Sequence, residues 1–273
     1  MRRRWRVFGL VAVAASMVAA CADSTDIAGQ EFTPQTPGRL TVATALPAPG
    51  FWDGTGVGEL TGGFEDGIAQ ALADRFDLQL DVIDVPFERL VAGDLGGADM
   101  ALAQITITPA REDVVDFSDP YYLDDAGAVL RAGEELTDLE TAKEQRWAVQ
   151  RGTVEAELLT DVVRPDTDPV LVDDPAAAVD AVAAGRVDAA LVDLSTALVL
   201  TKGRPEVTTG GRFVIDGEMA VALPRGSANV EVVDAALHAF DADRTLHDLR
   251  QRYLDPAFAK DPAAVPVIRT PDQ

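Results

Sequence analysis

Hydrophobic positions change their spacing several times along the chain, from the alternation typical of strands to the fourfold spacing typical of helices. Between two strand-like runs, 40–45 and 78–85, the residues Phe64, Ile68 and Leu72 recur every fourth position and predict one face of a helix. A strand, a helix and a second strand in this order predict a βαβ unit with parallel strands. A helix over FERLVAGDL and a strand over ADMALAQIT are expected to follow.

The same alternation of elements resumes later with new material. Asp174 followed by Pro175 predicts a helix N-cap with proline at the first helical position. The pattern predicts strands over 147–150, 169–174, 187–193 and 218–224, and helices over 152–162, 175–185, 195–203, 229–242 and 245–254. Two α/β units of ordinary size fit this length.

Composition narrows the class of protein. The chain is 47% hydrophobic and 25% charged over 273 residues, which is enough to bury a sizeable core. Its formal charge is −23, and its one dense basic cluster lies in the first six residues. The strongly acidic remainder of the chain repels nucleic acid and anionic membrane surfaces, so we expect no nucleic-acid partner. A single cysteine allows no internal disulfide or cysteine metal site, and we expect no metal and no cofactor.

The N-terminus has the zones of an export signal. MRRRWR is followed by an apolar run, 7–20, that is too short to span a bilayer comfortably, and then by Cys21. Val18-Ala19-Ala20-Cys21 resembles a bacterial lipobox, in which the cysteine is lipidated; an ordinary secretory signal with an incidental cysteine is the alternative. We therefore expect a signal peptide over 1–20 and a flexible tether over 21–37. The Pro-containing tail, 256–273, is expected to be an irregular wrap or a loose end.

Four segments resemble one protein family in their order and spacing. They match the polar-amino-acid (family 3) solute-binding proteins of bacterial ABC importers over about 38–255. The resemblance implies a type II periplasmic-binding-protein fold, in which two α/β lobes joined by two hinge crossovers close on a ligand in the cleft. Lobe 1 would comprise 38–125 plus 220–255, and lobe 2 would comprise 126–219. The segments are GGFEDGIAQALADRF, AQITITPAREDVVDFSDPYY, VQRGTVE and AGRVDAALVD.

A pocket for a free amino acid needs a planar cation for the carboxylate and an anion or carbonyls for the ammonium. Arg111 can supply the cation, although the residues alone favour a surface arginine that pairs with Glu112, Asp113 or Asp116. The resemblance implies that Arg111 binds the α-carboxylate beside Thr106, with the carbonyl of Gln104 facing the ammonium.

The resemblance places further ligand-binding residues in lobe 2. Thr153 and Val154 begin a predicted helix, so their backbone N–H groups can meet the same carboxylate; a plain helix cap is a compatible alternative. Asp193 ends a strand and would pair with the ammonium, or else cap the next helix. Gln150 stands where the family commonly faces the ligand side chain.

The sequence departs from the family pattern in two places. Gly67 stands where an acidic residue is usual, with Asp66 one position early. The aromatic residue that follows the first strand in the family is not in register here. We therefore expect the nearby aromatic residues Phe51 and Trp52 to line the pocket. Burial in the core of lobe 1 is the alternative.

Together these features predict a substrate-binding lipoprotein, held on the outer face of the cell membrane by lipidated Cys21. We expect a monomer that captures an amino acid, polar or acidic, by hinged closure and delivers it to an ABC permease. A dehydratase of the prephenate or arogenate type and a ligand-sensing protein are the alternatives. Acid–base catalysis would need a residue in the cleft, whereas His238 and His247 both fall in the closing helices, so we predict no enzymatic activity.

Overall fold

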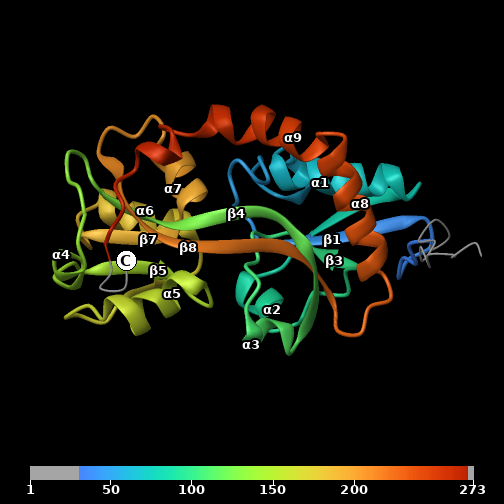
Figure 1. Cartoon of the computed structure of the whole chain (residues 1–273), viewed down its shortest axis with the longest axis horizontal. Coiled ribbons are helices and arrows are strands. Elements are labelled where there is room, and N and C mark those ends of the chain that lie inside the picture. Colours follow the sequence, from blue (N-terminus) through green and yellow to red (C-terminus); the bar gives the residue numbers. More distant parts are fainter. Residues whose placement is uncertain (1–30, 270–273) are drawn as a thin grey trace, which may run out of the picture.

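The computed structural model describes residues 31–269, so the predicted signal peptide and Cys21 lie outside the described residues. Figure 1 shows two α/β halves side by side, joined in the middle by the long strands β4 and β8. Within the described residues the strands form one mixed sheet in the order β2-β1-β3-β8-β4-β7-β5-β6.

Lobe 1 contains the first predicted βαβ unit. Strand β1 (Arg39–Thr44) pairs in parallel with β2 (Gln79–Asp84) and with the short β3 (Met100–Ala101), which confirms the predicted parallel sheet. Strand β3 is shorter than predicted, and Gln104, three residues beyond its end, adopts a left-handed backbone with φ 54 that the predicted extended run did not anticipate. The helices of this lobe are α1 (Phe64–Arg75), α2 (Phe87–Val91), α3 (Pro109–Glu112), α8 (Val230–Ala242) and α9 (Thr245–Tyr253).

Lobe 2 repeats the arrangement. Strand β5 (Trp147–Gln150) lies between β6 (Val170–Val172) and β7 (Ala189–Asp193), parallel to both. The predicted N-cap is confirmed, because the Asp174 side chain accepts a hydrogen bond from the Ala177 N–H at 2.7 Å. The helices are α4 (Leu139–Lys143), α5 (Val154–Leu158), which continues as a π-helical turn (Leu159–Val163), α6 (Pro175–Ala183) and α7 (Leu194–Thr201).

Two antiparallel strands, β4 (Val115–Arg131) and β8 (Val207–Pro224), belong to both lobes and form the two crossovers. The periodicity predicted only the end of β8 and none of β4, because polar residues and Pro120 interrupt the alternation where the strands cross. Their pairing shifts register between Asp124 and Ala126, and Asp216 opposite adopts φ 47. The predicted lobe boundaries, 125/126 and 219/220, fall in or beside this irregular segment.

Each lobe has its own core, and one contact in lobe 1 explains a departure from the family pattern. A Cβ at Gly67 would lie 2.4 Å from Leu249 Cδ2 of α9. Helix α9 therefore packs where the side chain of the usual acidic residue would begin.

The two ends of the described chain both pack onto the body. Phe32 stacks on Phe76 with ring centroids 4.7 Å apart, and the Gln35 N–H donates to Asp99 at 2.6 Å. The expectation of a flexible tether is therefore wrong for 31–37, whose aromatic ring finds an apolar partner. At the other end, Val265 and Ile268 are buried against lobe 2, so the described part of the tail is an irregular wrap that runs from lobe 1 to lobe 2.

Candidate ligand-binding site

A cavity of about 250 Å³ lies between the lobes at the carboxyl ends of the parallel strands, where open α/β sheets commonly bind ligands. The structure brings together at its wall every predicted binding residue except Phe51 and Trp52. Those lining it are Gln104, Thr106, Arg111, Gln150, Thr153, Val154 and Asp193.

Arg111 is the only cation that lines the cavity within the described residues. Its Nη1 donates to the Thr106 carbonyl at 2.6 Å, and its Nη2 donates across the cleft to the Gly152 carbonyl at 2.9 Å. The residue is only 7% exposed, and burial lowers its pKa against the opposing charges of Glu155, Glu157 and Asp193. No ion pair among residues 31–269 includes it, so the alternative of a surface arginine paired with a neighbouring acid is wrong.

Asp193 occupies the N-cap position of α7, but its side chain makes no capping hydrogen bond. Asp124 from the crossover strand β4 takes that role, because it accepts from the Ser195 N–H at 3.1 Å. Burial raises the pKa of Asp193 well above its usual value, and nearby Glu155 and Asp124 raise it further against the effect of Arg111. A ligand ammonium would supply the positive charge that this carboxyl lacks.

Gln104 joins the two lobes and is held by a buried acid. Its side-chain Oε1 accepts from the Thr196 hydroxyl of lobe 2 at 2.8 Å, while its backbone N–H donates to Glu65 at 2.7 Å. Glu65 also accepts from Trp52 Nε1 at 2.9 Å and from the Tyr121 hydroxyl. The sequence analysis did not identify Glu65 as a residue that supports the site. The one available indication was the presence of an acidic residue in the first turn of a predicted helix.

The start of α5 forms the lobe 2 wall of the cavity. Thr153 caps the helix by accepting from the Ala156 N–H at 3.3 Å, and its hydroxyl donates to the Gln150 carbonyl at 2.9 Å. Gly152 before it adopts φ 73, a left-handed conformation that glycine allows at low cost. The predicted helix cap is therefore present. Its acceptor oxygen binds the Ala156 N–H, so Thr153 does not cap the first backbone N–H groups of the helix.

Phe51 and Trp52 do not line the cavity, which corrects the expectation of pocket aromatics. They are 0% and 1% exposed in the core of lobe 1, where Phe51 packs edge-on against Phe64 with centroids 6.0 Å apart. The aromatic ring at the cavity is Phe87, which begins α2 just after β2 and lies 5.7 Å from the Arg111 guanidinium carbon. The hydrophobic character of an aromatic residue did not by itself distinguish a place in the core from a place at the cavity wall.

Four acidic residues at the wall were also missed: Asp84, Glu155, Asp173 and Asp174. Three of them directly end or follow the parallel strands β2 and β6, a position that could have been recognised from the predicted strands.

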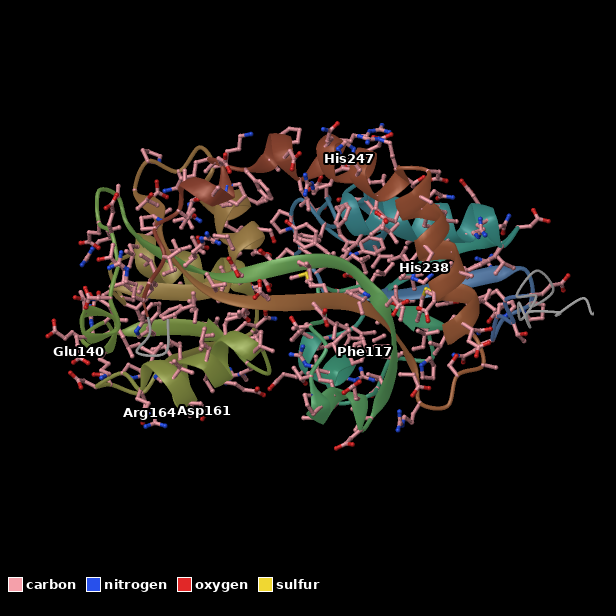
Figure 2. The ribbon with its side chains drawn as sticks, viewed as in Figure 1. Phe117, Glu140, Asp161, Arg164, His238 and His247 are labelled. Atoms are coloured by element: carbon pink, nitrogen blue, oxygen red, sulfur yellow. The ribbon has the colours of Figure 1, made fainter. Side chains whose placement is uncertain are left out.

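The two histidines lie elsewhere. Figure 2 shows His238 on α8 and His247 on α9, and neither residue lines the cavity. His238 Nε2 lies 2.9 Å from an Asp119 oxygen at a largely exposed position.

Among residues 31–269, no helix combines the length and the apolar character needed to cross a bilayer.

Comparison with protein families identifies this architecture. The family model for bacterial extracellular solute-binding proteins, family 3, matches residues 40–256. The chain belongs to this family. The predicted resemblance and the type II binding-protein fold are thereby confirmed.

Individual relatives of this solute-binding protein agree with that assignment. The L-cystine-binding protein TcyJ of Escherichia coli K12 is 32% identical over 203 residues, which cover 72% of this chain and 75% of TcyJ. An amino acid ABC transporter substrate-binding protein from Streptococcus pneumoniae, solved with L-arginine, is 29% identical with a TM-score of 0.71, covering 81% and 93% of the two chains. An ancestral arginine-binding protein bound to arginine is 26% identical with a TM-score of 0.71, covering 79% and 98%.

Proposed function

We propose that this solute-binding protein captures one free amino acid between its lobes and delivers it to an ABC permease for uptake. The observation that carries the proposal is Arg111, a buried guanidinium at the cavity wall that forms no ion pair with a carboxylate in the described chain. Such a group is costly to bury without an anionic partner, and the α-carboxylate of an amino acid offers one with matching planar geometry.

The opposite wall fits the other end of a zwitterion. Asp193 presents a partly buried carboxyl group from lobe 2 that makes no capping hydrogen bond and is suited to the α-ammonium. Thr153 and Val154 from lobe 2 and Thr106 from lobe 1 also line the cavity, which supports a role for their backbone N–H groups and the Thr106 hydroxyl in binding the carboxylate. Because the two ends of the ligand meet different lobes, binding favours the closed state.

The cross-cleft hydrogen bonds support this view of closure. Both Arg111 Nη2 to Gly152 and Thr196 to Gln104 join lobe 1 to lobe 2 around the cavity. An opening rotation would break both.

The transport setting rests on the relatives and on the N-terminal sequence. Relatives are named as binding proteins for L-cystine and arginine, and one as a subunit of an amino acid ABC transporter. The lipobox-like sequence before Cys21 supports a lipid anchor on the outer face of the cell membrane, with the folded body acting as a monomer.

Thermal shifts with all twenty amino acids would identify the ligand, since a ligand at 100 times its Kd stabilises by roughly 2.7 kcal/mol. Calorimetry with Arg111→Ala and Asp193→Asn should then show a loss of about 2–5 kcal/mol, or about 30- to several-thousand-fold in affinity. Arg39→Ala is the matched control, because this half-exposed arginine pairs with Asp81 at 3.7 Å and neither residue lines the cavity.

The control variant should bind within about threefold of the wild type, because an exposed ion pair contributes less than about 1 kcal/mol. Unchanged affinity in Arg111→Ala, or the absence of any shift across the amino acids, would overturn the proposed function.

A further inference from the structure

The charges at the cavity wall are strongly unequal. One cation, Arg111, faces five acidic residues among the described residues that line it. If the proposed function holds, the α-groups of the ligand account for Arg111 and Asp193 only. The remaining acids are Asp84, Glu155, Asp173 and Asp174.

Among residues 31–269, one ion pair includes any of these four acids, between Asp173 and Arg151 at 3.1 Å. Within the same residues, the Asp84 side chain accepts only from the Leu46 N–H, at 3.0 Å, and the Asp174 side chain accepts only from the Ala177 N–H, at 2.7 Å. These backbone hydrogen bonds fix the carboxylates in place but carry no formal charge, so an excess of negative charge remains in the filled cavity.

Glu155 is an independent sign of a missing partner. It lines the cavity and is 2% exposed, yet its Oε1 has no hydrogen-bond partner. A buried polar atom without a partner costs free energy, and one at the wall of a binding cavity is a place where a ligand donor is gained. Burial raises the pKa of Glu155, and the nearby Arg111 opposes that rise.

The sheet order places two of the surplus acids, Asp84 and Asp174, away from the residues assigned to the α-groups. Asp193 ends β7, which pairs with crossover strand β4, whereas Asp84 ends the edge strand β2 of lobe 1. Asp174 follows the opposite edge strand, β6 of lobe 2. A ligand held by its α-groups near the crossovers therefore extends its side chain toward carboxylates contributed by both lobes.

We propose that this cavity selects amino acids whose side chain carries a positive charge, a guanidinium or an ammonium group. Asp84 and Asp174 flank the side-chain end, and Glu155 adds an unpaired acceptor. This specificity departs from the acidic or amide side chains expected from the sequence, because a further anion would enter a cavity that already holds an excess of carboxylates.

Arginine and citrulline provide the test, since they have nearly the same shape and differ in side-chain charge. In calorimetry at low salt, arginine should bind about tenfold to a hundredfold more tightly than citrulline, and the ratio should fall as salt is added. Lysine should bind more tightly than glutamine, and glutamate should bind most weakly. Citrulline, glutamine or glutamate binding as tightly as the cationic ligands would overturn the inference while leaving amino-acid capture intact, whereas binding of none would overturn both.

Three isosteric variants assign the effect to residues. Asp84→Asn, Asp174→Asn and Glu155→Gln keep the side-chain shape, and asparagine also keeps the cap of α6. At least one of them should reduce the arginine-to-citrulline ratio by about threefold or more, while citrulline affinity stays within about twofold and so reports an intact cavity.

Glu140→Gln is the control, because this acid lies on α4 at the far end of lobe 2 (Figure 2) and pairs with Lys143. It removes one negative charge without touching the cavity. An arginine-to-citrulline ratio that none of the three cavity variants changes, or that Glu140→Gln changes equally, would refute the role of the cavity acids.

Discussion

The buried carboxyl group of Glu65 makes the stability of this protein depend on pH in an unusual direction. Burial raises the pKa of Glu65 from 4.5 to about 7, despite hydrogen bonds from Tyr121, Gln104 and Trp52 that act the other way. The folded protein therefore holds a proton between pH 4.5 and 7 that the unfolded chain releases. The stabilisation is complete below pH 4.5 and is lost as the pH rises through about 7.

The magnitude follows from that shift. A difference of about 2.5 pKa units corresponds to about 3 kcal/mol of unfolding free energy lost between these limits, with a slope near 1.4 kcal/mol per pH unit in the middle of the window. Burial also raises the pKa of Asp124 to about 7, and those of Asp193 and Glu155 rise too, so the wild type should lose more than this. Exposed acids with lowered pKa values, such as Asp138, act in the opposite sense only at more acidic pH.

Urea denaturation of the ligand-free protein from pH 4.5 to 8 measures this loss. Glu65→Gln cannot take up the proton, so its unfolding free energy should fall by about 3 kcal/mol less than that of the wild type over the same range. Glu140→Gln, an exposed control, should follow the wild type. A wild-type stability that rises toward pH 7, or an identical slope in Glu65→Gln, would refute the reasoning.

Three further predictions concern packing, closure and anchoring. Gly67→Ala should be more favourable by at least about 1 kcal/mol in a Leu249→Ala background than in the wild type, because the new Cβ meets Leu249; equal effects in a denaturation cycle would remove that contact as the cause. Small-angle scattering should show a smaller radius of gyration with saturating amino acid than without it, and tight binding with no compaction would count against hinged closure. Replacing Cys21 by serine should release the protein from membranes to the medium in cell fractionation, and a variant that stays bound would end the lipoprotein hypothesis.

The sequence predicted local elements better than it predicted the segments between the lobes. Helix α1 carries its own periodicity and α6 its own cap, and the parallel strands of both lobes are apolar runs bounded by turns. Strand β4 was not predicted because it passes from one lobe to the other. Its buried and exposed residues follow no single alternation, and its pairing with β8 shifts register. Such a crossover is defined by tertiary pairing rather than by local propensity.

The candidate site divides in the same way. Arg111 and Asp193 stand in motifs whose resemblance to the family predicted them as binding residues, although the residues alone left surface pairing and helix capping open. Phe51 and Trp52 were misplaced because a core and a pocket both accept aromatic rings. Glu155 was missed because the cost of a buried acid becomes visible only when the fold shows what surrounds it.

The C-terminal tail gives this solute-binding protein a third link between its lobes. Leu254 is buried in the core of lobe 1 and Val265 against lobe 2, with the Ala259 N–H bonded to the Leu198 carbonyl between them, and Figure 1 shows this segment crossing beside α9 and α7. If the lobes rotate about β4 and β8 as proposed, residues 255–264 must stretch or detach, so the link would limit the angles available to the open state. A smaller set of open conformations has a lower conformational entropy. Closing the lobes then costs less free energy, so less of the ligand's binding free energy is used for closure. In that case the residues beyond the family match at 256 act on the same equilibrium as the ligand.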